Sequence, residues 1–455
     1  MSTTTTTSQK TAPARPASGI TGAQLATAFD GTLERRQISV GYHVGIALVA
    51  VAMVLLPLVY FGIIAATVWL VWFHITHSVA MFHTGIRSGR VMVFLGVIYV
   101  APIIAGGLLV LAMILPLFWR SKRGPRPLWV DRREQPILYA YVEKLCDTMR
   151  APRPYRIDIC AAANASAHVD NGFFGLFRRR LVLTLGLPLA RSMTLKQFTG
   201  VVAHELGHFS QGSSMRLSYV VHNINRWFAR MAYGRSGIDD MLDEAMNSDS
   251  HWSFLLIGLM CRMVIGLARL VLKVMALVAH GLTMNLSRHA EFDADRQAAR
   301  IVGGDAMGDA LQGIPFLDAA FTLALERAQA GWKRRRLPDD LVVMTHALHR
   351  HLPTELKDSL TAQILTHEAS WFDTHPPLYK RVAVLKKAKL QGVLKLDAKA
   401  TVLFKDFDEL AKMATLDTYQ SVLGNLLQPE HLVATKVEVV TKAPAAPPGA
   451  KTAPG

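Results

Sequence analysis

Two long apolar stretches, in which no residue is charged, constrain the fold of this 455-residue chain more than any other feature. They run over residues 44–73 and 91–119, and each exceeds the roughly 20 apolar residues that cross the hydrocarbon core of a bilayer. Neither holds two spans and a turn, so each predicts one transmembrane helix, tilted or kinked near Pro57 and Pro102. The first is too long and too far from the start for a cleaved signal peptide. We therefore expect a multi-pass integral membrane protein.

Basic residues predict the orientation of these helices. The loop between the two stretches carries only Arg87 and Arg90, whereas more basic residues lie on the outer flanks. The flanking residues are Lys10, Arg15, Arg35 and Arg36 before the first stretch, and Arg120, Lys122, Arg123, Arg126, Arg132 and Arg133 after the second. Since Lys and Arg favour the cytoplasmic side, we expect the N-terminus and everything after residue 120 to be cytoplasmic, with the chain in the cell (inner) membrane.

The net charge of +16 suits a cytoplasmic body that rests on anionic membrane lipid. Nucleic-acid binding is the competing explanation, because residues 178–180 and 333–336 are basic runs. No recognition motif accompanies these runs, so we expect no nucleic-acid partner. The three cysteines show no paired spacing and suit a reducing compartment.

The rest of the sequence predicts a mainly α-helical fold with a small β-sheet. Strands are expected over residues 155–160 and 179–187, with a turn at 170–172 between them. Helices are expected over residues 134–149 and 194–209, and amphipathic helices from about 304 to 426. A T-x-x-Q capping box at Thr194 and Gln197 opens the helix over 194–209.

A third apolar stretch, residues 254–286, differs from the first two because it contains Arg262, Arg269, Lys273 and His280. On a helix of about 100° per residue these four side chains project within roughly 20° of one direction. Such a stripe is tolerated in a membrane only where it faces protein or water. We expect a membrane-associated helix, which either crosses the membrane with the stripe turned inward or lies at the interface.

The motif His204-Glu205-Leu206-Gly207-His208 predicts a metal site. Residues four apart share a helix face, so both imidazoles can reach one ion, and Glu205 is turned towards the water bound there. Zinc accepts imidazole nitrogens and keeps an open position in catalytic sites. The competing interpretation is a helix with two core histidines.

A catalytic zinc site needs a third protein ligand, and the segment LSRHAEFDADRQAA offers candidates. Glu291 and Asp295 are four residues apart on an expected helix, so Glu291 can bind the metal while Asp295 orients a ligand histidine through its other ring nitrogen. The competing interpretation is a solvated acidic helix face. Asp293, Asp295 and His289 are the alternative ligands in this segment.

The set HELGH, SRHAEFDAD and THPPLYKR, in that order, resembles the membrane-bound zinc metalloprotease family of the heat-shock protease HtpX and the CAAX prenyl endopeptidase. The resemblance covers about residues 120–390 and extends to the two N-terminal membrane helices. It implies a zincin-like (gluzincin) metalloprotease domain that binds one zinc ion per chain. The glutamate of the family's E-x-x-x-D pattern, which is the third zinc ligand, corresponds to Glu291, and its aspartate, which supports a ligand, corresponds to Asp295.

The resemblance also implies residues that contact substrate. Asn164, Ala165, Ser166 and Ala167 are similar to the family's N-A-x-A edge strand, with which a substrate backbone pairs as an added strand. His375 corresponds to a family histidine near the active site that steadies the oxyanion. Its competing interpretation is a capping or core histidine.

These features lead to one main hypothesis, a zinc-dependent endopeptidase that hydrolyses peptide bonds of membrane or membrane-associated proteins at the cytoplasmic face. Glu205 is its general base, and quality control of proteins is one role that it would serve. The alternative is a catalytically silent membrane scaffold that keeps zinc for folding and binds partners through its C-terminal helices. A transporter with an incidental motif is a third alternative, which two convincing spans disfavour.

The expected organisation follows from these features. We expect a disordered tail (1–40), two transmembrane helices (41–119), a zinc metalloprotease domain (120–390) with the membrane-associated helix at 254–286, a C-terminal helical extension (391–440) and a second disordered tail (441–455).

Overall fold

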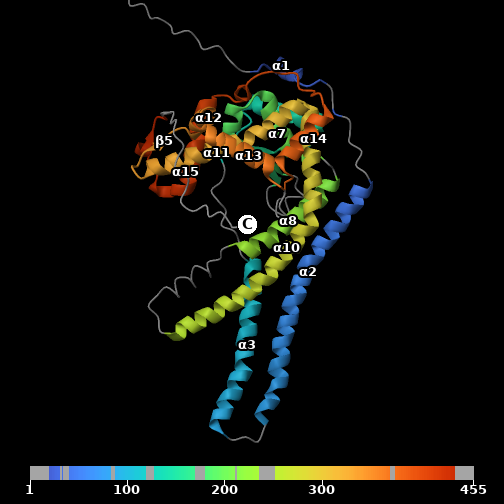
Figure 1. Ribbon diagram of the computed structural model, residues 1–455, viewed down its shortest axis with the longest axis vertical. Helices are drawn as coiled ribbons and strands as arrows, with labels where there is room; N and C mark the ends of the chain where they lie inside the picture. Colours follow the sequence, from blue (N-terminus) through green and yellow to red (C-terminus); the bar gives the residue numbers. More distant parts are fainter. Residues whose placement is uncertain are drawn as a thin grey trace, which may run out of the picture.

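A stalk of long helices carries a mixed α/β head at one end (Figure 1). The structure is a computed structural model, and it describes residues 20–30, 33, 40–83, 88–118, 128–169, 180–210, 213–234, 252–368 and 375–435. The described stalk consists of α2 (Val40–His77), α3 (Gly89–Phe118), α8 (Ser213–Tyr233) and the first part of α10 (Trp252–Val302).

The helices α2 and α3 form an antiparallel hairpin that is joined by the 3-10 helix η1 (Ser78–His83). Both predicted spans are thus helical, and both are long and apolar enough to cross a membrane. Most of their large apolar side chains point outward, as lipid-facing surfaces require. The buried hydroxyl of Tyr60 donates to the carbonyl of Met113 over 2.8 Å and so links the two helices.

The third apolar stretch and the segment that contains Glu291 and Asp295 form one helix. α10 runs without a break from Trp252 to Val302, so it carries the polar stripe and Glu291 on a single rod. Its small residues Ala268, Ala276 and Ala279 are buried against the stalk core, while other apolar side chains are exposed. Those exposed side chains include Leu259, Met263, Leu267, Leu270, Val274 and Leu277. α10 is the third helix that is long and apolar enough to cross a membrane.

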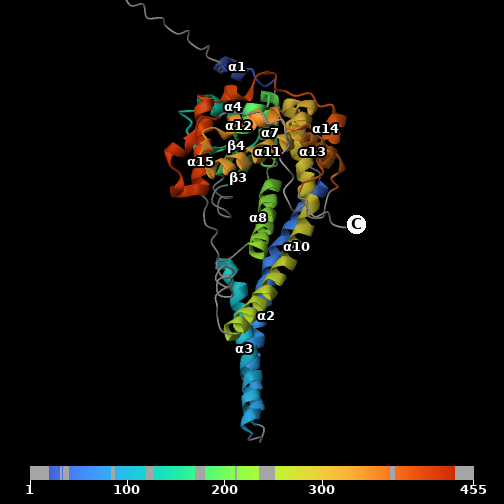
Figure 2. The same ribbon diagram turned by 60° about the vertical axis from the view of Figure 1, so that its left-hand side comes forward.

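The sequence analysis missed α8, which lies beside α10 and also contacts α2 (Figure 2). Its apolar residues recur at helical spacing, and Val221, Phe228 and Met231 are buried in the stalk core. Asn225 of α8 donates through its amide to the hydroxyl of Thr283 on α10 over 3.3 Å. These contacts fix the direction in which α10 enters the head.

The head contains a four-stranded sheet of order β1-β2-β4-β3. The strands are β1 (Trp129–Val130), β2 (Arg156–Cys160), β3 (Ala165–Val169) and β4 (Leu181–Gly186). β2 and β4 are parallel, whereas β3 is antiparallel to β4 and forms one edge. The two predicted strands are therefore confirmed as β2 and β4. The predicted turn at 170–172 lies outside the described residues.

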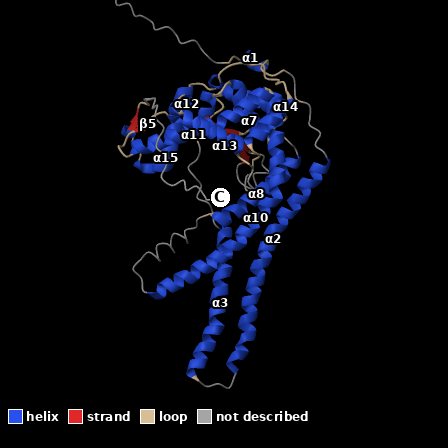
Figure 3. Cartoon of the chain, in the orientation of Figure 1, coloured by secondary structure: helices blue, strands red, loops and turns tan. Residues whose placement is uncertain are grey.

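Helices make up most of the described head, and the fold is mainly α with a small β-sheet, as predicted (Figure 3). In the head, the described α-helices before α10 are α1 (Gly22–Ala26), α4 (Pro136–Met149), α6 (Leu187–Ser192) and α7 (Leu195–Gly207). After α10 come α11 (Gly304–Trp332), α12 (Leu341–Arg350), α13 (Thr354–Thr366), α14 (Leu378–Ala388), η2 (Ala400–Leu403), α15 (Phe407–Leu423), η3 (Gly424–Leu426) and η4 (Pro429–His431). A small parallel pair, β5 (Leu337–Pro338) and β6 (Leu432–Val433), completes the head.

The segment after α14 crosses the head as a strap, which we define as residues 391–406. Leu394 is 2 % exposed and donates its backbone N–H to the carbonyl of Ile301 over 2.8 Å. The side chain of Gln135 exchanges two hydrogen bonds with the backbone of Lys405. The strap therefore shares one core with the sheet, α7 and the end of α10, and it connects them to α15.

The first part of the chain departs from the expected disordered tail. Residues 20–30 are ordered, because Ala28 and Phe29 insert into the head core and Phe29 contacts the ring of Tyr141 at 5.7 Å. The backbone of Ala28 accepts a hydrogen bond from the strap residue Lys395 over 2.9 Å. These residues thus differ from the expected tail, since a few apolar groups suffice when a core is ready to receive them. Residues 1–19 and 436–455 lie outside the described residues.

Candidate metal centre

Helix α7 presents two histidines at its C-terminal end. The predicted capping box opens the helix, with Thr194 accepting from the N–H of Gln197 and the Gln197 side chain bonding back. The middle of α7 is buried in the head core. His204 is buried in its last turn, and His208 forms the C-cap and is half-buried. The helix end thus points both imidazoles at the helix that packs beside it.

That neighbour is α10, and the glycine of the motif permits the close approach. A Cβ atom added to Gly207 would lie 3.3 Å from the Cα of Ala294, so a larger residue would push the two helices apart. Ala294 lies between Glu291 and Asp295, which are both buried. The close contact brings these two carboxylates to the two imidazoles.

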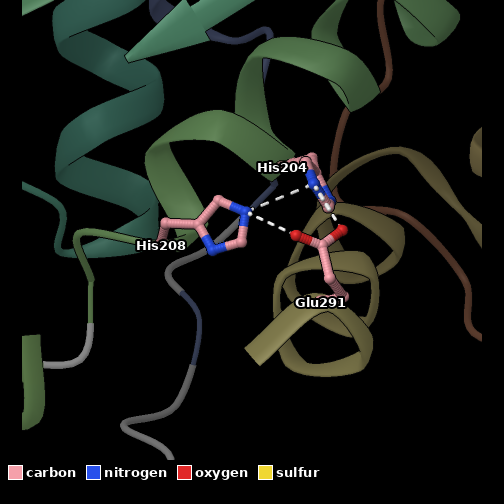
Figure 4. A group of neighbouring side chains, drawn as sticks. All are labelled: His204, His208 and Glu291. Atoms are coloured by element: carbon pink, nitrogen blue, oxygen red, sulfur yellow. Dashed lines mark hydrogen bonds and ion pairs between the residues drawn. The ribbon is translucent and has the colours of Figure 1, made fainter. Parts of the chain in front are cut away.

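Three side chains converge on one point (Figure 4). The Nε2 atoms of His204 and His208 lie 3.3 Å apart, and each lies 3.5 Å from a carboxylate oxygen of Glu291. Tetrahedral ligands at about 2.0–2.1 Å from zinc are separated by about 3.3–3.4 Å, so these atoms are spaced as such a site requires. Two imidazole nitrogens and one carboxylate are also donors that zinc accepts. The group therefore fits a zinc ion.

The second acidic residue of the motif supports a histidine. Oδ1 of Asp295 lies 2.9 Å from Nδ1 of His204, on the side of the ring away from His208 and Glu291. A carboxylate on Nδ1 favours the proton there and leaves Nε2 free to bind a metal. This is the position in which the sequence analysis placed Asp295.

The environment of His204 also changes its basicity when no metal is bound. Burial by itself lowers the pKa of His204, but hydrogen bonds to Asp295 and Glu291 outweigh burial and raise that pKa to about 9. A metal-free site at neutral pH therefore holds a proton where a metal would bind.

Glu205 lies beside the ligand group without belonging to it. Its Oε2 accepts a hydrogen bond from the backbone N–H of Ala167 over 3.2 Å. Burial raises the pKa of Glu205, and the nearby charge of His204 opposes that rise. A buried carboxylate with a raised pKa is suited to exchange protons near neutral pH.

The predicted edge strand lies next to Glu205. The strand β3 contains Ala165, Ser166 and Ala167, and Asn164 comes directly before it. β3 pairs with β4 on one side. Because the N–H of Ala167 donates to Glu205, this backbone N–H points away from β4. The strand thus turns one row of backbone groups towards the candidate site.

His375 also reaches the site, although most of its side chain is exposed. Its Nδ1 lies 3.0 Å from Oε2 of Glu291, and 65 % of the side chain is accessible. The hydrogen bond to Glu291 raises the pKa of His375. Pro376 and Pro377 follow it and lead into α14. The structure places His375 within reach of the carboxylate of Glu291.

The sequence analysis did not single out Arg381, which lies on α14. This residue is buried and bonds both oxygens of Asp295, at 2.7 Å in each case. The available signal was its place in THPPLYKR, six residues after His375. Sequence alone did not show that it turns towards Asp295, because that direction depends on how α14 packs against α10.

Comparison with known proteins agrees with this arrangement. The sequence profile of peptidase family M48 matches residues 132–389, which include every residue of the candidate metal centre. The chain belongs to peptidase family M48. This confirms the family resemblance that the three motifs predicted.

Curated relatives of this M48 chain carry the name Protease HtpX. The relative from Hahella chejuensis is 26 % identical over 231 residues, which are 48 % of this chain and 62 % of the relative. The relative from Actinobacillus pleuropneumoniae is 23 % identical over 301 residues, which are 62 % of this chain and 86 % of that protein. The M48 chain thus spans less than two thirds of the first relative. No solved structure matches it.

Proposed function

We propose that this chain is a membrane-bound zinc metalloendopeptidase that hydrolyses peptide bonds of membrane or membrane-associated proteins at the cytoplasmic face. The observation that carries the proposal is the convergence of His204, His208 and Glu291 on one point, with Glu205 beside them. Membership of peptidase family M48 supports the same reaction class.

His204, His208 and Glu291 would hold one zinc ion per chain, with Asp295 fixing the ring of His204. When bound, zinc supplies a Lewis acid that makes a water molecule more acidic and polarises a peptide carbonyl. Two neutral imidazoles and one carboxylate leave a net positive charge on such a site. This charge favours the ionised form of Glu205 next to it.

Glu205 performs the proton transfers in this proposal. Its carboxylate accepts a proton from the attacking water and returns it to the leaving amine, as a general base and then a general acid. The hydrogen bond from the Ala167 N–H holds one oxygen of Glu205 and leaves the other for the water. Burial keeps this carboxylate out of bulk solvent, so its position relative to the substrate is defined.

The edge strand and His375 would position the substrate. We assign residues 164–167 to substrate binding, because β3 is the last strand on one side of the described sheet, where an extended peptide can join as a further strand. His375 approaches from the segment just before α14, outside the two helices that carry the ligands. As a donor it would stabilise negative charge on the substrate oxygen, and such donors contribute several kcal/mol at most, about 3–4 in known cases.

The proposed cytoplasmic location rests on charge and on the N-terminal segment. Residues 20–30 precede α2, yet Phe29 is buried in the head core. Both ends of the α2–α3 hairpin therefore face the head, and the Lys and Arg residues that flank the hairpin favour the cytoplasm. The apolar first part of α10 lies along this hairpin, and we assign it to the membrane as well.

The scaffold alternative explains less of the site. A zinc ion that serves folding alone is usually held by a closed set of four ligands and has no need of a buried carboxylate beside it. Here the described ligand group has three members, and the half-buried Glu205 lies next to it. Quality control of membrane proteins is one role that fits a protease in this position.

Replacement of Glu205 by glutamine tests the proposal. Glu205→Gln keeps the size of the side chain and removes the carboxylate that accepts the proton. Cleavage of an unfolded membrane-protein substrate in lipid should fall by a factor of about 10² to 10⁴, while zinc content and melting temperature stay at wild-type values. Glu326→Gln, on an exposed position of α11, is the matched control and should cleave normally.

Two outcomes would contradict the proposal. If Glu205→Gln cleaves at the wild-type rate while the zinc-free protein is inactive, Glu205 is not the general base. If the zinc-loaded wild type cleaves no peptide under varied lipid conditions, the scaffold alternative is favoured instead.

A further inference from the structure

We propose that Arg381 is a positioning residue of the metal centre, which acts through Asp295 to fix the ring of His204. The inference rests on the proposed function, because it assigns His204 as a zinc ligand. It concerns a residue on α14, outside the two helices that carry the ligand group, which bonds Asp295 and lies 3.4 Å from the carboxylate of Glu291.

The contact between Arg381 and Asp295 has a specific shape. Nε of Arg381 lies 2.7 Å from Oδ2 and Nη2 lies 2.7 Å from Oδ1, so the guanidinium and the carboxylate face each other edge to edge. Two parallel N–H bonds fix the plane of the carboxylate as well as its place. Side-chain exposure is 10 % for Arg381 and 2 % for Asp295, so water does not compete for these bonds.

The same carboxylate oxygen serves the histidine. Oδ1 of Asp295 is bonded by Arg381 and also lies 2.9 Å from Nδ1 of His204. With its plane fixed by Arg381, Asp295 can accept the Nδ1 proton in one direction only. The Nε2 atom of His204 is then held towards His208 and Glu291. A rotated carboxylate would lose this alignment even if the ion pair survived.

Arg381 also supplies the charge that the buried carboxylates require. Its Nη2 lies 3.4 Å from Oε2 of Glu291, in addition to its bonds with Asp295. Buried carboxylates without a nearby cation are costly. A single positive charge would satisfy this electrostatic need, whereas only the two parallel N–H groups of a guanidinium fix the plane of the Asp295 carboxylate. Replacing Arg381 by lysine therefore keeps the charge but removes the fixed orientation of Asp295.

The position of α14 explains why this residue is not merely an anchor. His375 and Arg381 lie on either side of the first turn of α14, and both reach the carboxylates of α10. Ordinary anchoring of α14 is already provided by its buried residues Val382 and Leu385. The fork of Arg381 is thus available for orienting Asp295.

Zinc affinity, measured by competition with a chelator, tests the inference on the full-length protein in lipid. Replacing a residue that supports a ligand weakens metal binding by about 10- to 100-fold. We expect Asp295→Asn to weaken zinc binding within this range and Arg381→Gln to weaken it by about 10-fold. In the double variant the loss of zinc affinity should be clearly smaller than the sum of the two single losses, because Arg381 acts mainly through Asp295 and only secondarily through its 3.4 Å contact with Glu291.

Two further variants separate orientation from other roles. Arg381→Lys keeps the charge but loses the two parallel bonds, so its zinc affinity should remain below wild type. It also carries the test if Arg381→Gln fails to fold. Lys380→Gln, at the exposed neighbouring position of α14, should bind zinc normally. The visible absorption of the cobalt-substituted protein reports ligand geometry, and Arg381→Gln should shift it in the same direction as Asp295→Asn.

Three results would overturn the inference. These are wild-type zinc affinity in Arg381→Gln, wild-type affinity in Arg381→Lys, and additive losses in the double variant. Each must be seen in protein whose wild type binds zinc and cleaves substrate. If the wild type binds no zinc, the proposed function itself is contradicted. The zinc measurement on the wild type therefore distinguishes that failure from a failure of the role of Arg381.

Discussion

His204 and Asp295 lie on different helices, and Nδ1 of the imidazole is 2.9 Å from Oδ1 of the carboxylate. The other ring nitrogen of His204 is directed at His208 and Glu291, at 3.3 and 3.5 Å. One edge of the His204 ring is thus occupied by the Asp295 carboxylate, which holds the proton on Nδ1. The other edge faces two potential metal ligands. Metal and proton therefore compete for Nε2 of His204.

The first prediction concerns this competition. The pKa of His204 is about 9 without metal, because its hydrogen bonds to Asp295 and Glu291 outweigh the effect of burial. Below that pKa the ring carries two protons, and zinc must displace the one on Nε2. Zinc affinity should therefore rise with pH, by up to about 10-fold per pH unit for one proton, and level off above the pKa.

Calorimetric titration with zinc in buffers of different ionisation enthalpy measures this proton release. At pH 7.5 we expect about one proton from His204 for each zinc bound. In Asp295→Asn the released fraction should fall, because the bond that raises the pKa of His204 is weakened. Zinc uptake without proton release at this pH would contradict the prediction.

The second prediction concerns the third ligand. Glu291→Ala should reduce the zinc content of purified protein well below one ion per chain, since a three-ligand site would lose its carboxylate. His204→Ala and His208→Ala should do the same. Elemental analysis that finds full zinc in Glu291→Ala would remove Glu291 from the ligand set. Asp293, Asp295 or His289 would then be the candidates from the same segment.

Local spacing explains why much of the site could be predicted. His204 and His208 share a helix face, as do Glu291 and Asp295, and these relationships hold wherever the helices lie. The long-range partners are different. Arg381 reaches Asp295 only because α14 packs beside α10, and a spacing of 86 residues carries no signal for such a contact.

The fold shows the same division. Uncharged apolar stretches predicted α2 and α3, since a membrane helix is recognisable from composition alone. α8 was missed, because polar residues lower its mean hydropathy and only the spacing of Val221 and Phe228 marks its buried face. Residues 20–30 were expected to be disordered from composition, yet Phe29 finds a partner that is distant in sequence.

The third prediction concerns topology. A reporter fused after Arg133 should stay in the cytoplasm, because the flanking Lys and Arg residues favour that side for both ends of the α2–α3 hairpin. Alkaline phosphatase fused there should be inactive, since that enzyme requires export. The same reporter inserted after Ser88, between the two helices, is the matched control and should be active. Strong activity of an exported fusion after Arg133 would invert the proposed orientation.

The fourth prediction concerns the strap. Leu394 is 2 % exposed, packs in the head core and forms an isolated bridge with Phe29 of the N-terminal segment. Its backbone is also bonded to Ile301 at the end of α10, so one residue joins three distant parts of the chain. Leu394→Ala leaves a cavity at this junction and should lower the free energy of unfolding by about 2–5 kcal/mol.

Thermal unfolding of the detergent-solubilised protein measures this loss as a lower melting temperature. Val422→Ala is the matched control, because its side chain is 79 % exposed on α15, and surface changes of this kind are usually within about 0.5 kcal/mol of wild type. Equal melting temperatures for the two variants would mean that the strap is a separate extension. A selective loss in Leu394→Ala would mean that residues beyond the M48 match contribute to the core that holds α7 and α10 in place.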